Sequence, residues 1–508
     1  MTQAFQLLHP AVQRKLWDMK WTELRPIQVE AIEHLIGGTP TDCIIASPTA
    51  SGKTEAAFLP VLSAIADEPA GGVRAMYIGP LKALINDQFG RIEQLCERME
   101  MPVCRWHGDV DDGPRKALLA RPAGILLITP ESLEAMFVLR PSQLAGLFGR
   151  LAYVVIDEMH AFLGSPRGAQ LISQLHRIRI RIRTGADPIR IGLSATLGDR
   201  AAACRWLRGA GRPVHVIEAS DHGAAIRLKL TGSWRPASDN DDDDPSIAEV
   251  ARAILHACRG KTNLVFANAK TLIEALADEL RTQASAMGIV DEIVVHHGSL
   301  SKDEREHAET QLRSGRPCTA VCSNTLELGI DIGEIDSVVQ VSPPWSVASL
   351  VQRLGRSGRR EGAARVLRGY FVEDVPGADA TLWDRLHLDF IRGVAAIELM
   401  IERWLEAPEV DRAHWSTLVQ QVLSCLAETG GIRAHDLFPR LAESGAFYAL
   451  NRANFAMLLR ELGARDLIEQ LPDATLVLSS RGSVSSSTTV STPRSKRLRS
   501  FRSCFAIG

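Results

Sequence analysis

Short apolar runs alternate with longer amphipathic stretches in two successive series, and this alternation constrains the fold more than any other feature. Polar, Gly or Pro residues follow each run and a helical pattern comes next, which is typical of βα units in a parallel sheet. The sequence therefore predicts an α/β protein with two parallel sheets. The runs are residues 42–46, 74–78, 124–128, 151–156 and 189–193 in the first series, and 263–266, 292–295, 319–322, 337–341 and 365–371 in the second.

The composition excludes several classes of protein. The chain has 508 residues, of which 45% are hydrophobic, and this predicts three or four globular domains. The net charge of −2 excludes blanket binding of phosphates in the manner of histones, but it leaves room for a local basic groove. No run approaches 18 apolar residues and no secretory signal opens the chain, so we expect no membrane span. Nine cysteines without a CxxC pair indicate reduced thiols in a cytoplasmic protein rather than a metal site.

A polar segment separates the two series. Residues 216–245 include four consecutive aspartates, which predicts a solvated linker rather than a calcium site. The expected α/β domains are then residues 1–215 and 246–378. Two such domains joined by a polar linker create a cleft, which is a favoured place for a ligand.

Beyond Leu382 the pattern becomes helical. A pair of helices of helix-turn-helix size precedes a hairpin that turns at Pro472 and Asp473. Three helices and a hairpin predict a winged-helix domain, which together with its connecting helix spans residues 379–478. The expected helices are residues 391–406, 417–427, 433–444 and 451–462, and the expected hairpin is residues 467–478.

The last segment breaks every earlier pattern. Residues 479–508 contain ten serines, six Lys or Arg residues and no acidic residue. This composition predicts a disordered Ser/Thr/Arg tail, with a basic nucleic-acid-binding tail as the alternative. The abrupt change leads us to expect that the tail arises from a frameshift near Ser480, which reading the gene in its other frames would test.

The strongest local motif is ASPTASGKTE, residues 46–55, which lies between a strand-like run and an amphipathic helix. Backbone N–H groups of such a loop surround phosphates, and the helix N-terminus adds positive potential. Lys53 would reach the β- and γ-phosphates, and the Thr54 hydroxyl would ligate Mg²⁺. The pattern GxxxxGK[ST] is incomplete because Ser47 stands at its first glycine. The loop residues expected to cradle phosphates are Thr49, Ala50, Ser51 and Gly52.

The second motif is DEMH, residues 157–160, at the end of the apolar run 151–156. A carboxylate at the C-terminal end of a parallel strand is expected beside the phosphate loop of a neighbouring strand. Asp157 can therefore hold Mg²⁺, and Glu158 can orient and deprotonate an attacking water. The alternative for an isolated Asp-Glu pair is a helix N-cap, but the upstream phosphate loop favours catalysis.

The third motif is QRLGRSGRR, residues 352–360. Its four arginines form either a basic patch of nuclear type or a phosphate grip on nucleic acid. The spacing predicts that Arg356 and Arg359 lie one helical turn apart on one face. Two guanidinium groups in that arrangement can stabilise transition-state charge during hydrolysis of a nucleotide, with Gln352 beside them.

With these motifs in place, the chain resembles the superfamily 2 helicases of the DExH type, and most closely their Lhr (large helicase-related) branch. The resemblance covers about residues 5–478 and implies two tandem RecA-like domains followed by the winged helix. It is carried, in the order of the family, by RPIQ (25–28), IGPLKALINDQ (78–88), ITPESL (128–133), FLGSPRGAQL (162–171), GLSATLGD (192–199), LVFANAK (264–270), HHGSLS (296–301), SNTLELGIDIG (323–333) and AAIELMIERWLEAP (395–408).

The resemblance also implies roles for individual residues. Gln28 would read the adenine and Asp331 would lie near the ribose of ATP. His160, Ser194 and Thr196 would couple hydrolysis to strand binding. The residues implied at the nucleic-acid strand are Pro80, Lys82, Asn86, Gln88, Thr129, Glu131 and Arg167 in the first domain, and His297, Ser299, Ser323 and Thr325 in the second.

The implied activity is an ATP- and Mg²⁺-dependent helicase or translocase. Its partner would be single-stranded or tailed-duplex nucleic acid, with DNA favoured over RNA and 3′→5′ polarity. One alternative is an RNA-remodelling ATPase, because phosphate contacts do not report the 2′-hydroxyl. Another is a truncated protein that binds nucleic acid without hydrolysis. That alternative is favoured by Ala50, where the family has glycine, and by the missing C-terminal domain of larger relatives.

Overall fold

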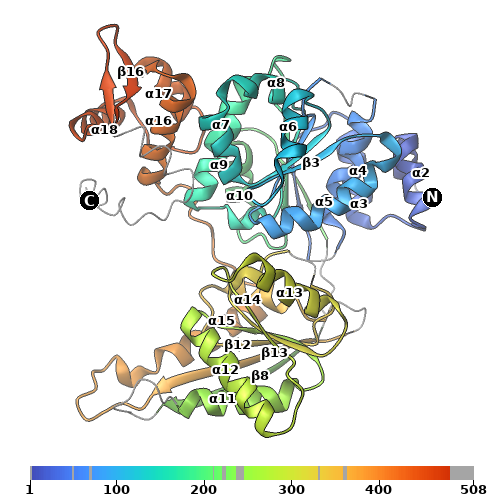
Figure 1. Cartoon of the computed structure of the whole chain (residues 1–508), viewed down its shortest axis with the longest axis vertical. Coiled ribbons are helices and arrows are strands. Elements are labelled where there is room, and N and C mark those ends of the chain that lie inside the picture. Colours follow the sequence, from blue (N-terminus) through green and yellow to red (C-terminus); the bar gives the residue numbers. More distant parts are fainter. Residues whose placement is uncertain are drawn as a thin grey trace. The chain divides into compact units, whose positions relative to one another are not determined.

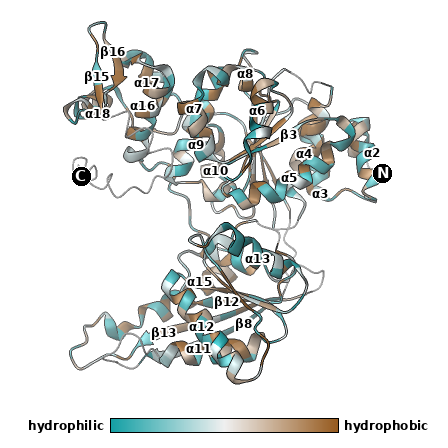
Figure 2. Ribbon diagram, viewed as in Figure 1, coloured by the Kyte–Doolittle hydropathy of each residue, from teal (hydrophilic) through white to brown (hydrophobic). Residues whose placement is uncertain are grey.

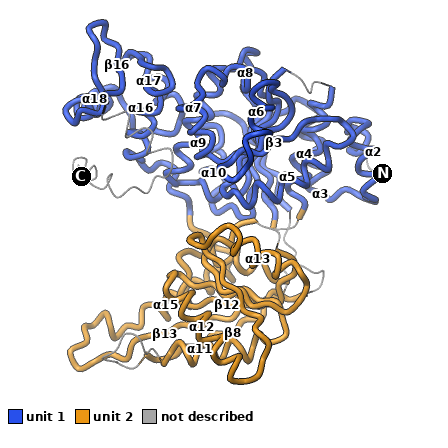
Figure 3. The backbone as a smooth tube through the Cα atoms, viewed as in Figure 1, with its two compact units in different colours: residues 1–47, 52–219, 407–508 blue, residues 48–51, 220–406 orange. Residues whose placement is uncertain are grey.

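The computed structural model describes most of the chain and divides it into two compact units (Figure 3). Unit 1 draws on the ranges 1–47, 52–219 and 407–508, and unit 2 on the ranges 48–51 and 220–406. Unit 1 therefore contains segments from both ends of the sequence. The described residues are 3–48, 51–67, 71–209, 211–219, 225–235, 245–329, 332–358 and 363–480.

Unit 1 is built on a sheet of seven strands in the order β3-β4-β2-β5-β6-β1-β7 (Figure 1). Every pairing in it is parallel. The central strands are continuous apolar runs because helices cover both of their faces. The strands are β1 (Cys43–Ala46), β2 (Ala75–Ile78), β3 (Val103–Trp106), β4 (Ile125–Ile128), β5 (Tyr153–Ile156), β6 (Ile189–Ser194) and β7 (His215–Glu218).

Successive residues of these strands point to opposite faces, so the sheet has a core on each side. Ile45, Tyr77 and Val155 pack with helices α1 to α5, whereas Ile44 and Ile156 pack with α7 to α10. The helices that flank the sheet carry both hydrophobic and hydrophilic residues (Figure 2). The helices are α1 (Gln3–Leu7), α2 (Pro10–Asp18), α3 (Pro26–Ile36), α4 (Lys53–Ile65), α5 (Lys82–Cys96), α6 (Asp112–Ala120), α7 (Pro130–Leu139), α8 (Leu144–Phe148), α9 (Pro166–Arg179) and α10 (Arg200–Arg208).

The C-terminal part of unit 1 is a helical region with a small antiparallel sheet in the order β14-β16-β15. Its apolar residues form one core, which also includes Ala169 of α9. Three of the four predicted helices and the hairpin are thereby confirmed here, whereas the helix expected at residues 391–406 corresponds to α15 (Leu388–Ile401), which belongs to unit 2. The elements are α16 (Trp415–Thr429), β14 (Ile432–Arg433), α17 (Ala434–Ala442), α18 (Arg452–Ala464), β15 (Ile468–Gln470) and β16 (Thr475–Leu478).

Unit 2 contains a second parallel sheet, of six strands in the order β10-β11-β9-β12-β13-β8. The predicted fold class, two parallel α/β sheets followed by a winged-helix region, is confirmed. The strands are β8 (Ile226–Arg235), β9 (Thr262–Phe266), β10 (Ile293–His296), β11 (Cys318–Cys322), β12 (Ser337–Val341) and β13 (Arg365–Asp374). The helices are α11 (Pro245–Cys258), α12 (Lys270–Ala286), α13 (Lys302–Arg313), α14 (Val347–Leu354) and α15 (Leu388–Ile401).

Two strands lie in the range 216–245 that we expected to be a linker. β7 extends the first sheet, and β8 pairs with β13 over ten residues at the edge of the second sheet. Most residues of β8 are exposed, so it lacks the continuous apolar run that marks the strands we predicted. The acidic run within this range and the tail from residue 481 lie outside the described residues.

Among the residues that the structure describes, no helix combines the length and the apolar character needed to cross a membrane.

Candidate functional site

The phosphate-binding motif forms a turn between β1 and α4. Gly52 caps the N-terminus of α4 with a φ of +87°, a left-handed conformation that glycine adopts without strain. A Cβ at this position would also lie 2.6 Å from Gln28 Nε2. The motif therefore presents the positive end of a thirteen-residue helix, which suits phosphate. Thr49 and Ala50 lie outside the described residues.

Lys53 and Gln28 hold the ends of this turn. Lys53 Nζ donates to the carbonyl oxygen of Ser47 at 2.5 Å, across the loop. Gln28 Nε2 donates to the Gly52 carbonyl at 3.4 Å, while its Oε1 accepts from Arg25 N at 2.9 Å. Gln28 of the RPIQ motif thus contacts the phosphate loop itself, and its side chain is buried.

The DEMH motif begins directly after β5. Asp157 is buried, accepts a hydrogen bond from the Tyr77 hydroxyl, and accepts a second from Glu158 N at 2.8 Å. The backbone of Glu158 is left-handed, with φ +46° and ψ +46°. Our expectation that this strand neighbours the strand of the phosphate loop is wrong by one strand, because β6 lies between β5 and β1. Sequence periodicity predicts strands but does not give their order in a sheet.

Burial raises the pKa of Asp157, and the adjacent Glu158 raises it further, whereas Tyr77 and Lys53 act in the opposite direction. A divalent cation would favour the charged form of both carboxylates. The described residues contain no cluster of three or more His, Cys, Asp or Glu side chains suited to a metal. One carboxylate and the Thr54 hydroxyl nevertheless fit Mg²⁺, which proteins often hold through one or two carboxylates and the phosphates of a substrate.

The Ser-Ala-Thr sequence at residues 194–196, within the GLSATLGD motif, connects the DEMH motif to the phosphate loop. Ser194 is the last residue of β6, and its carbonyl oxygen accepts from Ser47 N, the start of the phosphate loop, at 3.0 Å. Its hydroxyl donates to Thr196 O at 2.5 Å, so His160 Nδ1 must donate to Ser194 Oγ, 3.1 Å away. The same His160 nitrogen lies 3.5 Å from Glu158 Oε2. The structure therefore connects the carboxylate pair to the phosphate loop through the side chains of His160 and Ser194 and the backbone carbonyl of Ser194, while Thr196 contributes only backbone atoms.

Three of the residues implied at the nucleic-acid strand meet in unit 1. Arg167 makes a two-pronged ion pair with Glu131, at 2.7 and 3.1 Å, and its Nη2 donates to Pro80 O at 2.9 Å. Thr129 caps α7 by accepting from Ser132 N at 3.3 Å. The arginine therefore ties the start of α9 to the loop after β2 and the start of α7.

A second group lies at the start of α5. Lys82 Nζ pairs with Asp109 at 2.9 Å, and Asn86 Oδ1 accepts from Arg105 Nη1 at 3.0 Å and from His107 Nε2 at 2.9 Å. Gln88 is buried. Burial lowers the pKa of His107 to about 4, so this imidazole is neutral at pH 7.

In unit 2 the motifs after β10 and β11 lie side by side. Ser323 Oγ lies 3.3 Å from Thr325 Oγ1, which is also 2.8 Å from His296 Nδ1. His297 is buried and its Nδ1 accepts from Ser299 N at 3.3 Å. All four residues implied in this unit are thus brought together.

The arginine motif departs from our expectation. Gln352 is buried on α14, but that helix ends at Leu354, and Arg356 lies in the following turn. Arg356 is buried and its Nη2 donates to Glu327 O at 2.7 Å. α14 therefore ends before Arg356, and Gly358 has a φ of +66°, so the described part of this motif does not continue as a helix; the spacing of the two arginines stays a prediction. Arg359 and Asp331 lie outside the described residues.

Two histidines of these groups, His107 and His296, were not predicted as site residues, although His296 lies within the quoted HHGSLS motif. A signal for His107 exists, because β3 and β10 are edge strands of their sheets and each leads into a His-Gly pair, at residues 107–108 and 297–298, of which only His297 was predicted. A comparison of the first series of strands with the second would have indicated the ends of β3 and β10 as equivalent positions. Tyr77, whose hydroxyl contacts Asp157 from the adjacent strand, was likewise not predicted.

Comparison with known proteins matches both halves of the chain. Residues 25–203 match the DEAD/DEAH box helicase family, and residues 246–361 match the helicase conserved C-terminal domain. An ATP-dependent helicase Lhr-Core of Saccharolobus solfataricus is 29% identical over 473 residues, covering 90% of this chain and 52% of that protein. A Lhr helicase/probable uracil glycosylase of Mycolicibacterium smegmatis is 28% identical over 499 residues, covering 90% of this chain and 32% of that protein.

A solved structure is similar over nearly the whole chain. The Mycobacterium smegmatis helicase Lhr bound to ssDNA and AMP-PNP aligns with a TM-score of 0.75 and 28% identity, covering 94% of this chain and 61% of that one. The chain thus spans about half of the Lhr-Core relative's length and a third of the longer relative's.

Proposed function

Because the chain belongs to the DEAD/DEAH-box helicases of superfamily 2 and is similar to Lhr helicases over most of its length, we propose that it couples ATP hydrolysis to movement along a nucleic-acid strand. The observation that carries this proposal is the connection from the Asp157–Glu158 pair through His160 and Ser194 to the phosphate loop. A protein that only bound a nucleotide would not need such a connection.

The phosphate loop would hold ATP. N–H groups at the start of α4 and the ammonium group of Lys53 would contact the phosphates, and Thr54 and Asp157 would hold Mg²⁺. When bound, the ion neutralises charge on the phosphates. We assign the adenine contact to Gln28 and the ribose contact to Asp331.

Glu158 would act as the general base. Its carboxylate accepts a proton from the attacking water, a role that is typically worth about 10²–10⁴-fold in rate. We assign Gln352, Arg356 and Arg359 to stabilising the charge that develops on the transferred phosphoryl group. The buried state of Arg356, bonded to Glu327 O, implies that this side chain is held in place by its own unit.

Nucleic acid would be held mainly through its phosphates, without sequence preference. Lys82, Asn86 and Arg167 in unit 1 would contribute, as would Ser323 and Thr325 in unit 2. The Mycobacterium smegmatis structure contains ssDNA, and on that basis we favour single-stranded DNA over RNA. The 3′→5′ direction of movement is proposed from the family resemblance alone. We also propose a cytoplasmic location, because all eight cysteines in the described part of the chain are free thiols.

The test is ATP hydrolysis at saturating ATP and Mg²⁺, with single-stranded DNA or RNA of equal length. We expect stimulation by DNA to exceed stimulation by RNA, and we expect the Lys53→Ala variant to lose hydrolysis while keeping its thermal transition. Greater stimulation by RNA would favour an RNA-remodelling ATPase. Absence of hydrolysis with either polymer would reject the proposal.

A further inference from the structure

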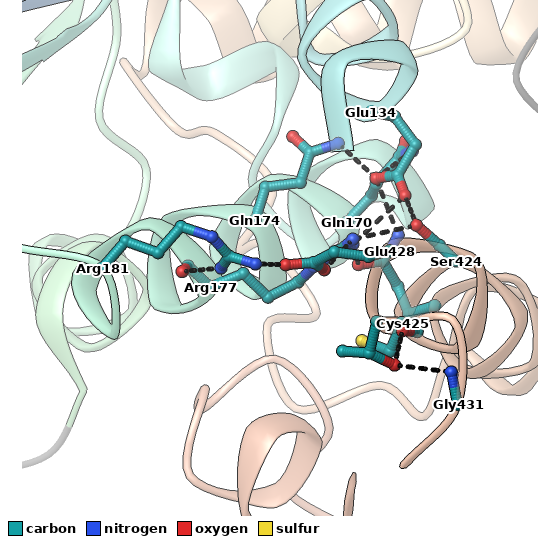
Figure 4. A network of polar contacts seen from close by, with 11 residues as sticks. Glu134, Gln170, Gln174, Arg177, Arg181, Ser424, Cys425, Glu428 and Gly431 are labelled. Atoms are coloured by element: carbon teal, nitrogen blue, oxygen red, sulfur yellow. Dashed lines mark hydrogen bonds and ion pairs between the residues drawn. The ribbon is translucent and has the colours of Figure 1, made fainter. Parts of the chain in front are cut away.

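Unit 1 contains a buried network of polar side chains between α7, α9 and α16 (Figure 4). None of its members belongs to a helicase motif discussed above, although each is almost fully shielded from water. We call it the α16 network. Its members are Glu134, Gln174, Arg177, Gln421, Ser424 and Glu428.

Arg177 lies at the centre of the network. Its Nη1 lies 3.2 Å from Glu134 Oε1 on α7, and its Nη2 lies 2.5 Å from Glu428 Oε2 on α16. Its side chain is fully buried, and the guanidinium carbon lies 3.9 Å from the centre of the Phe137 ring. One cation on α9 therefore binds a carboxylate from each of two other helices.

The Glu134 carboxylate on α7 accepts hydrogen bonds at both of its oxygens. Glu134 Oε2 accepts from Gln174 Nε2 at 2.6 Å and from Gln421 Nε2 at 2.9 Å, and Ser424 donates to Oε1. Burial alone would raise the pKa of Glu134, but Arg177 and these donors outweigh it and hold the pKa below its usual value. The carboxyl group is therefore ionised at neutral pH.

The charges balance once a neighbouring arginine outside the six members is counted. Glu428 also contacts Arg181, which lies in the turn after α9, so two carboxylates face two guanidinium groups. Buried ion pairs often add little to stability compared with apolar packing, and their best-attested use is to fix one register between packed elements. An apolar contact alone would tolerate sliding of α16 over α7 and α9.

The network continues to the proposed nucleic-acid grip. Gln174 Nε2, which binds Glu134, also donates to the carbonyl oxygen of Pro130 at 3.0 Å, the first residue of α7. Thr129 and Glu131 flank this proline, and Arg167 at the start of α9 binds Glu131. Hydrogen bonds thus run from α16 to the loop that we assign to strand binding.

A second contact joins the segment before α16 to the loop before α9. Gly164, in the loop between the DEMH motif and α9, has a φ of +64°, and a Cβ there would lie 3.0 Å from Glu409 N. His414, the residue before α16, forms a hydrogen bond with the backbone of the same glycine. The segment that leads into α16 therefore packs against the segment that follows the catalytic motif.

We propose that Arg177 is a positioning residue that locks the winged-helix region to the first RecA-like domain, so that the strand-binding loop at the start of α7 keeps its place only while α16 is docked. The expected effect on nucleic-acid binding rests on the proposed function. The docking itself is independent of that function and can be measured without nucleic acid.

The test uses a triple variant of the full chain, Arg177→Met with Glu134→Gln and Glu428→Gln. It removes the central charges together, so that no carboxylate of the network stays buried without a partner. The matched control is Arg179→Met, which removes a half-exposed arginine of the same helix that pairs with Asp187. The first readout is hydrogen exchange at Ser132 and Leu133, whose amides bond to Thr129. The second is the DNA concentration that gives half-maximal ATPase.

We expect the triple variant to exchange these amides faster and to need on the order of tenfold more DNA, with maximal ATPase changed less than twofold. The control should match the wild type in both readouts. If the triple variant does not fold, Arg177→Lys takes its place, because a point charge cannot reproduce the two-sided contact. It should show the same changes in smaller degree.

Unchanged exchange and an unchanged DNA requirement in a folded variant would overturn the positioning role alone. A wild-type chain whose ATPase responds to no polynucleotide would overturn the proposed function, and with it the consequence drawn here. The two failures are distinguishable because the exchange measurement contains no nucleic acid.

Discussion

Glu158 and Gly52 have left-handed backbones, and both lie in the candidate site. For Glu158, which has a side chain, this conformation costs on the order of 1–3 kcal/mol and persists only where neighbouring contacts impose it. Its amide donates to Asp157 Oδ1 and its carboxylate lies near His160. The DEMH motif predicted Asp157 and Glu158 because the two acidic residues are adjacent in the sequence. It did not predict Tyr77, which reaches Asp157 from another strand.

Replacing Gly52 with alanine tests the phosphate loop at this scale. Alanine at a φ of +87° is strained, and its methyl group would press on Gln28. We expect the affinity for ATP to fall about tenfold or more, with only a small loss of thermal stability, because about 1–2 kcal/mol is the usual cost of a left-handed residue. Equilibrium binding of ATP measures this.

Gly38→Ala is the matched control, since a Cβ there meets nothing within 4 Å. Equal ATP affinity in both variants would contradict the role assigned to the turn.

At the scale of elements, periodicity predicted most buried strands to within two residues, but it missed strands that lack a continuous apolar run. β3 alternates buried and half-buried residues, and β8 is mostly exposed at a sheet edge. Periodicity also cannot tell that β6 separates β5 from β1, since strand order depends on long-range packing. The helix expected through Arg356 ends at Leu354, and the positive φ of Gly358 shows that it does not resume there.

The end of β3 gives a prediction for pH. Burial lowers the pKa of His107 to about 4, below the value near 6.5 of an unfolded chain. The folded protein therefore favours the neutral imidazole, whose contribution to stability is present above pH 6.5 and is lost as the pH falls towards 4. We expect the melting temperature of the wild type to fall more steeply between pH 7 and pH 5 than that of His107→Gln. Parallel pH profiles of the two proteins would show that His107 does not titrate in this way.

At the scale of the whole molecule, unit 1 joins the two ends of the sequence. Arg177 and Glu428 are 251 positions apart, and no local pattern encodes their pairing. We expected the winged helix to be a separate domain, because local sequence patterns indicate its helices and hairpin. The surface on which these elements pack leaves no such local pattern. The shared core around α16 makes these segments one compact unit.

The Leu426→Ala variant tests whether the winged-helix region and the rest of unit 1 form one cooperative unit. Leu426 is buried in the core of α16, and its truncation should cost about 2–5 kcal/mol. We expect faster hydrogen exchange in both the winged-helix region and α9, with exchange in α11 and α12 unchanged. Met457→Ala, at an exposed position of α18, should change neither. An effect confined to the winged-helix region would show that it folds independently of the first sheet.

Single-turnover ATP hydrolysis by Glu158→Gln, with single-stranded DNA present, tests the assigned general base most directly. We expect the variant to bind ATP nearly as tightly as the wild type, while its hydrolysis rate falls about 10²–10⁴-fold. A rate equal to that of the wild type would contradict the assignment of Glu158 as the base and, with it, the mechanism by which this chain is proposed to move on nucleic acid.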